Sequence, residues 1–187
     1  MKKTLIIISL LTAFLLCACQ SDQYRIHGRV TSNELEGVKV FLVPYGHEER
    51  ENVDSTLIHN HEFSFKGNKH WMCTVRLIAH ERYKGQDLLV ATEPGDIFVT
   101  IGPDSRGGGT PLNDSLQVWK DLTIEHNRLY GQLYDAGMKE EARKEREAYK
   151  ERTREIARGV GEDSILGEFL LQLYPLPKEQ EQAVDPQ

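Results

Sequence analysis

The stretch from Val53 to Gly67, V-D-S-T-L-I-H-N-H-E-F-S-F-K-G, decides the fold class. On one side of its centre, every second residue would share one strand face: Val53, Ser55 and Leu57. On the other side, the corresponding face would carry Phe63 and Phe65. Alternation with a period of two is typical of strands with one buried face. Asn60 tolerates the positive φ of a tight turn, so the chain is expected to reverse at Asn60-His61. The stretch therefore predicts a hairpin of two antiparallel strands.

Five more short segments of strand character lie on both sides of this hairpin. They are residues 24–30, 38–43, 74–79, 88–91 and 97–101. Turn residues separate them, for example Pro94-Gly95 before the last one. With the hairpin they make about seven strands, and this spacing predicts an antiparallel β-sandwich over residues 24–103.

The composition changes at residues 104–111, which contain three consecutive glycines. Gly107–Gly109 before a helix also suggests a phosphate-binding loop. The P-loop pattern ends in Gly-Lys-Ser/Thr, however, and here Thr110-Pro111 follows without a lysine. We therefore interpret residues 104–111 as a Gly-rich hinge.

Residues 112–175 form the predicted helical segment, so the fold class is α+β. The first helix has one apolar stripe at alternating spacings of three and four: Leu112, Leu116, Trp119, Thr123, His126, Tyr130 and Leu133. Residues 139–158 hold fourteen charged residues in twenty and predict a second helix that is solvated on most of its surface. A third helix begins near Ser164, and residues 176–187 are predicted to be a disordered tail.

The aromatic part of the first helical stripe admits two interpretations. Such a stripe usually belongs to a core, but the charged second helix offers little apolar surface to cover it. Exposed apolar surface on a monomer marks an interaction site. Trp119, Tyr130 and Leu133 are therefore the candidate contacts to an envelope protein partner or to a second copy of the chain.

The N-terminus has the pattern of a bacterial export signal. Lys2 and Lys3 precede the apolar run 5–16, which at twelve residues is too short to span a bilayer. Leu16-Cys-Ala-Cys19 resembles a lipobox, in which lipidation falls on the cysteine after a small residue. This predicts a signal peptide over residues 1–18, a palmitate-type anchor on Cys19, and a tether over 19–23 in the cell envelope, at the outer membrane. The alternative is an ordinary cleaved signal peptide.

Charge and cysteine content exclude other classes. The chain has a net charge of −6, and loss of the two lysines in residues 1–18 takes it to −8. An acidic chain argues against nucleic acid as a partner, since phosphate contacts need clustered Lys and Arg. Once Cys17 is removed and Cys19 acylated, Cys73 has no partner for a disulfide. Its apolar neighbours indicate a buried side chain.

Two weak clusters of reactive residues remain. His59 and His61 are two residues apart and His70 follows, but a zinc site needs three or four convergent ligands. Asp54-Ser55 lies near these histidines without a Gly-x-Ser-x-Gly elbow. We expect no metal site, no cofactor and no catalytic residue, and thus no enzyme.

Four motifs in order resemble a known family: Tyr24-Arg-Ile-His-Gly, Val53-Asp-Ser-Thr with Glu62-Phe-Ser-Phe-Lys-Gly, Glu93-Pro-Gly-Asp-Ile-Phe-Val, and Gly109-Thr-Pro-Leu-Asn-Asp. They are similar to an N-terminal domain of unknown function in Bacteroidetes lipoproteins. In that family the domain usually precedes a thioredoxin-like domain of the thiol–disulfide oxidoreductase or peroxiredoxin type. The likeness covers about residues 24–120, and the thioredoxin-like part is expected to be absent from this sequence, so no catalytic residue carries over.

The expectation for function follows from the anchor and from the absence of a catalytic pattern in the sequence. We expect a membrane-anchored envelope lipoprotein that acts as a non-catalytic binding or structural module. The alternative, which the resemblance implies, is an accessory domain for thiol–disulfide or peroxide metabolism in the envelope.

Overall fold

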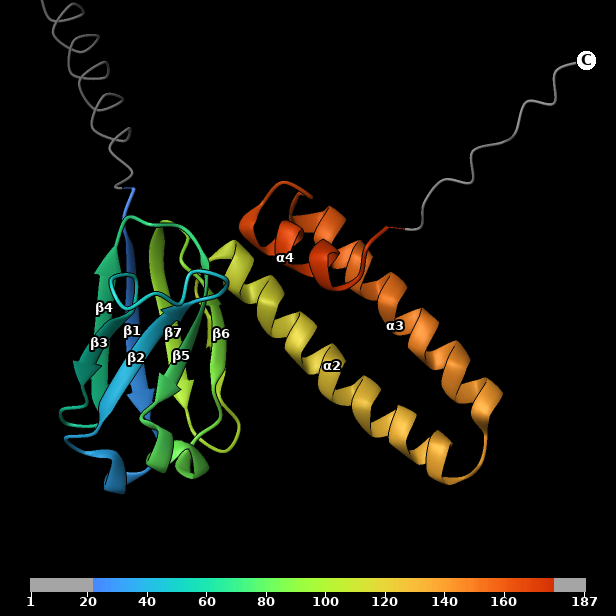
Figure 1. Ribbon diagram of the computed structural model, residues 1–187, viewed down its shortest axis with the longest axis horizontal. Coiled ribbons are helices and arrows are strands. Elements are labelled where there is room, and N and C mark those ends of the chain that lie inside the picture. Colours follow the sequence, from blue (N-terminus) through green and yellow to red (C-terminus); the bar gives the residue numbers. More distant parts are fainter. Residues whose placement is uncertain (1–21, 177–187) are drawn as a thin grey trace, which may run out of the picture.

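The computed structural model describes residues 22–176. The predicted signal peptide, Cys19 and nearly all of the predicted tail lie outside these residues. The described part is an α+β fold, with two four-stranded sheets packed in a sandwich-like arrangement and three helices beside them (Figure 1). Among residues 22–176, no helix has the length and apolar character needed to cross a bilayer.

Eight strands make up the two sheets. The first sheet has the order β4 (Glu62–Gly67), β1 (Tyr24–Val30), β7 (Gly95–Ile101) and β8 (Arg106–Gly108). The second has the order β3 (Asp54–Leu57), β2 (Lys39–Pro44), β5 (Met72–Leu77) and β6 (Leu88–Ala91). Two short 3₁₀ helices, η1 (Asn33–Leu35) and η2 (Ala79–Lys84), lie in the connections.

The first sheet is mixed, which corrects the predicted antiparallel sandwich. β1 and β7 run parallel, with Tyr24 opposite Gly95 and Val30 opposite Ile101. The chain enters β7 from β6 of the second sheet, beside the start of β1, where the Gly95 N–H donates to the Gln23 carbonyl at 3.1 Å. A strand that re-enters at the same end must run in the same direction. The eighth strand, β8, lies within the Gly-rich segment 104–111.

The predicted hairpin is right in its turn and wrong in its pairing. Asn60 and His61 have φ of 52° and 64°, and two hydrogen bonds of 2.9 Å join the backbones of His59 and Glu62. The strands on either side, however, belong to different sheets: β3 pairs with β2, and β4 pairs with β1.

This crossing between sheets also changes which side chains are buried. Phe63 and Phe65 face the core as predicted. On the other side of the turn, Leu57 is 44% exposed and Ile58 is fully buried. The buried face there is therefore offset from the predicted Val53–Leu57 face, because Ile58 passes between the sheets as the chain changes sheet.

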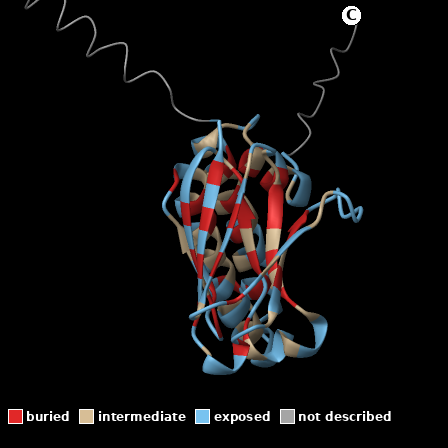
Figure 2. Ribbon diagram, turned by 90° about the vertical axis from the view of Figure 1, so that its left-hand side faces the viewer, coloured by how far each residue is buried: buried red, intermediate tan, exposed pale blue. Residues whose placement is uncertain are grey.

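The main core lies between the two sheets. Buried and exposed residues alternate along the strands (Figure 2). β1 buries Ile26 and β7 buries Ile97, and the second sheet contributes Val75 and Val90. Cys73 is buried in the same core, as predicted, and burial raises the pKa of its thiol to about 12.

The helices are α2 (Pro111–Asp135), α3 (Lys139–Val160) and α4 (Ile165–Leu173). α2 and α3 run side by side in opposite directions and extend away from the sheets (Figure 1). The charged second helix is exposed or partly exposed along most of its surface, as predicted, but one of its faces is buried. That face buries Ala142, Tyr149, Thr153 and Ala157. Their spacing of seven, four and four places them on one side of the helix, where small residues allow close approach to a neighbouring helix.

A second core joins the helices to the outer side of the second sheet. Met72 and Ala91 from the sheet pack with Leu116 of α2, Ala157 of α3 and Phe169 of α4. The Asn113 side chain accepts a hydrogen bond from the Ala91 N–H at 3.0 Å and donates to the Ala91 carbonyl at 2.8 Å. These two bonds attach the start of α2 to β6 where the sheet would otherwise have a free edge.

Candidate functional site

The outer side of the first sheet carries the polar residues that alternate with its core residues. Strand register arranges them in three rows, which together we name the open face: Glu62, Arg29, Thr100 and Arg106; Ser64, His27 and Phe98; and Lys66, Arg25 and Asp96. Neighbouring strands lie about 4.8 Å apart, and residues two apart on a strand are separated by about 7 Å. The open face is therefore a grid of side chains held by backbone hydrogen bonds.

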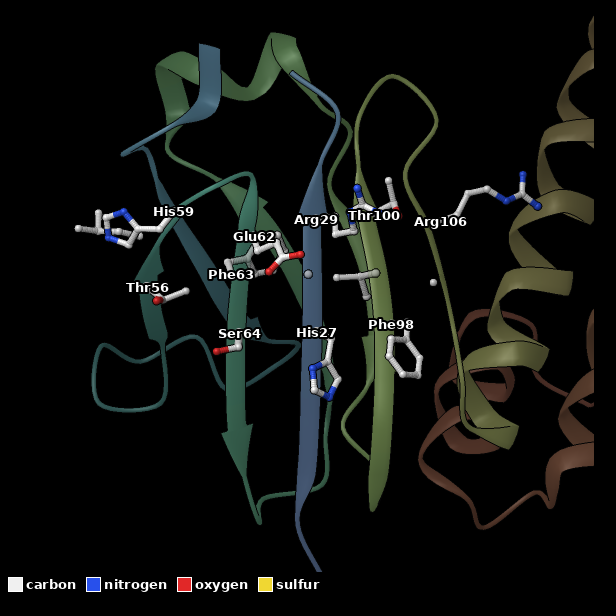
Figure 3. A pocket seen from close by; sticks show the side chains of 14 residues that line it. His27, Arg29, Thr56, His59, Glu62, Phe63, Ser64, Phe98, Thr100 and Arg106 are labelled. Atoms are coloured by element: carbon white, nitrogen blue, oxygen red, sulfur yellow. The ribbon is translucent and has the colours of Figure 1, made fainter. Parts of the chain in front are cut away.

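A shallow groove of about 710 Å³ runs over the first two rows (Figure 3). Its floor includes His27, Arg29 and Phe98, and one side is formed by Thr56 of β3 and by His59 in the turn that follows β3. Its lining is a mixture of hydroxyl, imidazole, guanidinium and aromatic groups. This is the mixture from which binding sites for polar ligands are built.

Phe98 is the apolar centre of the open face. It is 57% exposed, although both of its neighbours along β7, Ile97 and Val99, are buried. One side of its ring stacks on His27, with centroids 5.2 Å apart and planes 21° apart. Gly109 also lies next to the ring: a Cβ there would come within 2.6 Å of it, and φ is +99°. Glycine at 109 thus leaves room for the ring.

The Gly-rich segment, which the sequence predicts to be a hinge, forms strand β8 and hydrogen bonds to α2. Gly107 and Gly108 lie in β8, and the Gly107 N–H donates to the Gln117 side chain of α2 at 3.0 Å. The Gly109 N–H donates to the Asp114 carboxylate at 2.8 Å. These backbone donors are occupied by the protein's own side chains instead of facing outward toward a phosphate.

Acidic partners neutralise some of the cations on the open face. Asp96 accepts a hydrogen bond from His27 at 2.8 Å and lies 3.7 Å from Arg25. The bond from His27, and then the charge of Arg25, lower the pKa of the Asp96 carboxyl. Arg106 pairs with Asp104 and with Asp121 of α2, at 3.2 Å and 2.9 Å.

Two cations of the open face stand apart from this pattern. Within residues 22–176, no acidic group lies within 4.0 Å of the Arg29 or Lys66 side-chain nitrogens. Glu62 faces Arg29 across the strands in register but forms no such pair with it. Of the four Arg and Lys side chains on the open face, Arg25 and Arg106 are thus paired with carboxylates, and Arg29 and Lys66 are not.

The structure separates the histidines that sequence inspection grouped. His59 and His61 lie at the turn between β3 and β4. His70 lies elsewhere, bound to the Thr92 carbonyl at 2.5 Å and to Asp22 at 3.0 Å. Over the described range 22–176, no three His, Cys, Asp or Glu side chains converge in a geometry that could hold a metal ion.

The three residues predicted to contact a partner lie in different surroundings along α2. Trp119 packs edge-on against Phe169, with centroids 6.1 Å apart, and belongs to the second core. Tyr130 stacks on Tyr134 at 6.2 Å, and like Leu133 it is partly exposed. At 1.5 Å per residue, Trp119 and Tyr130 are about 16 Å apart along the helix. They do not form one compact site.

Sequence inspection missed the open face, although a signal for it was present. In Asp96-Ile-Phe-Val-Thr-Ile101 the alternation places Ile97, Val99 and Ile101 in the core. Phe98 then occupies an outward position among polar residues. A large aromatic residue at a position that alternation assigns to solvent is the pattern that could have identified the site.

Comparison with known proteins gives one result. Residues 24–116 match a family described as Domain of unknown function (DUF4369). This range covers both sheets, including the whole open face, and the first residues of α2. Neither a curated protein nor a solved structure matches the chain.

Proposed function

Residues 24–116 belong to the Domain of unknown function (DUF4369) family, and from this premise we propose that the chain is a lipid-anchored envelope lipoprotein with a non-catalytic binding domain. Cys19 provides the anchor to the membrane, and the open face of the first sheet binds the ligand. The outer membrane is the proposed location.

The observation that carries this proposal is the exposure of Phe98 in the centre of a polar and cationic sheet face. A solvent-facing phenyl ring exposes apolar area at a cost of about 25 cal/mol per Å² relative to burial. Helices cover the apolar outer side of the second sheet, whereas Phe98, flanked by His27 and Gly109, is 57% exposed. An aromatic ring in such a setting is typical of a binding surface.

The predicted anchor keeps this domain close to the bilayer. β1 begins at Tyr24, five residues after Cys19. A fully extended chain of five residues spans about 17 Å. The sandwich would therefore act within a short distance of the membrane surface.

The proposal also keeps a contact of α2 with a protein partner or a second copy of the chain, now limited to the exposed part of the helix. Tyr130 and Leu133 are partly exposed, and the neighbouring Tyr134 is 59% exposed. The alternative role in thiol–disulfide or peroxide metabolism gains no support from Cys73, whose thiol is buried with a raised pKa.

The test uses the full-length protein, produced with labelled palmitate, and a suspension of host cell-envelope material. Cys19→Ala should abolish the label and release the protein into the soluble fraction. Phe98→Ala combined with Arg29→Ala should retain the label and membrane fractionation but bind clearly less envelope material. The anchor proposal is wrong if Cys19→Ala still carries label, and the binding proposal is wrong if the double variant binds as the wild type does.

A further inference from the structure

We propose that the open face binds an acidic polysaccharide, that is, a chain of sugar rings carrying carboxylates. This inference rests on the proposed binding function and names its ligand class. It uses three features of the face: an exposed ring, cations free of acidic partners, and hydroxyl groups between them.

The exposed ring of Phe98 indicates that the ligand contains sugar rings. A pyranose ring has a face of C–H groups that can lie flat on an aromatic ring. This contact buries apolar area of both the sugar and the aromatic ring. Phe98 is stacked on His27, so its ring is held in place before a ligand arrives. A preorganised ring loses little conformational entropy on binding.

The cations of the open face indicate that the ligand also carries negative charges. Arg29 and Lys66 lie in the two rows on either side of the His27–Phe98 row, each about 7 Å from it along the strands. Positive charge on both sides of one aromatic row fits a repeating anion better than a single small one. The guanidinium of Arg29 can also bind a carboxylate through two parallel hydrogen bonds.

Hydroxyl groups complete the site. Thr100 lies beside Arg29 in one row, and Ser64 lies beside His27 in the next. Such groups both donate and accept hydrogen bonds, as sugar hydroxyls require. The groove of about 710 Å³ is open along its length, so a chain can enter without threading through an enclosed cavity.

Single-stranded nucleic acid shares rings and negative charge with this ligand, but the face fits it less well. Binding single strands requires several aromatic rings for successive bases and a strongly positive groove. The open face has one exposed phenyl ring, which offers a stacking position for only one base. A polymer with one carboxylate on each sugar and apolar ring faces matches the observed surface more closely.

The experiment measures binding of the full-length protein in detergent to four probes at low salt. Polygalacturonate carries both rings and carboxylates, dextran carries rings alone, polyglutamate carries carboxylates alone, and oligo-dT represents single-stranded nucleic acid. Polygalacturonate should bind at least tenfold more tightly than each of the other three, and its affinity should fall as salt is raised.

Variants assign the binding to the open face. Phe98→Ala should weaken polygalacturonate binding about three- to tenfold, which corresponds to the usual worth of one aromatic contact. Arg29→Ala should weaken it by a similar factor and reduce its salt dependence. The matched controls are Tyr83→Ala, which removes another exposed ring, and Lys144→Ala, which removes a cation from α3. Both should bind as the wild type does.

Each other outcome overturns the inference in a recognisable way. Equal binding of polyglutamate means that charge alone suffices, and equal binding of dextran means that the carboxylate has no role. Tighter binding of oligo-dT assigns the face to nucleic acid. If no probe binds but the Phe98/Arg29 double variant still loses envelope material, the ligand class is wrong while the binding function stands.

Discussion

The two sheets of the sandwich share one core but differ on their outer sides. The second sheet turns Met72 and Ala91 outward, and the helices cover them. The first sheet turns Arg29, His27 and Phe98 outward, where they line the groove of the open face (Figure 3). The same two-residue periodicity thus produces a structural contact on one side of the molecule and an exposed surface on the other.

This difference shows that helices cover a sheet face whose outward residues are apolar, whereas a face with polar outward residues stays exposed. Leu88-Leu-Val-Ala91 is apolar at every position, which is typical of a strand buried on both faces. Arg25-Ile-His-Gly-Arg29 is polar at every second position, which is typical of a strand with one solvated face. Phe98 is the exception on the solvated side, and for that reason it identifies the candidate site.

The largest expected effect concerns the covered side. Phe169→Ala removes a ring that packs edge-on against both Trp119 and Tyr45. We expect a loss of about 3–5 kcal/mol in the free energy of unfolding, because the change leaves a cavity in the second core. Urea denaturation followed by circular dichroism measures it. A loss below about 1 kcal/mol would mean that the helices do not depend on this core for their attachment.

An intermediate effect concerns the core that both sheets share. The pKa of the Cys73 thiol is about 12 in the folded protein, against an ordinary 9.0. The unfolded chain therefore loses this proton first, and stability falls as the pH rises above 9 toward 12. The expected loss is about 1 kcal/mol by pH 10.

The control for this pH dependence is Cys73→Ala. The variant starts from lower stability at pH 7, so the comparison uses only the slope of stability between pH 8 and 10. That slope should be shallower in the variant. Equal slopes would show that other groups cause the alkaline loss, such as Tyr24, whose pKa burial also raises to about 12.

The smallest expected effect concerns the open side. Phe98→Ala should change the free energy of unfolding by less than about 1 kcal/mol, since the ring is mostly in solvent and leaves no cavity. The measurement is the same urea titration as for Phe169→Ala, so the two phenylalanines can be compared directly. A loss close to that of Phe169→Ala would make Phe98 a structural residue and remove the main support for the binding face.

Local patterns in the sequence determined much of this protein. Strand alternation placed Ile26, Phe63 and Phe65 in the core, Asn60-His61 formed the tight turn, and the stripe from Leu112 to Leu133 formed a helix with one packed side. The apolar setting of Cys73 predicted its burial. These features depend on neighbours within a few residues, which a sequence displays directly.

Only the tertiary structure decided which elements meet. The alternation in β3 and β4 is the same whether they pair with each other or, as here, with β2 and β1 in different sheets. The parallel pairing of β1 with β7 joins residues 71 positions apart, as in Tyr24 with Gly95. The open face collects its rows from β4, β1, β7 and β8, of which only β7 and β8 follow each other in the sequence. Strand periodicity fixes the side on which a residue lies, but partner choice depends on long-range packing, so the site became visible only in the folded chain.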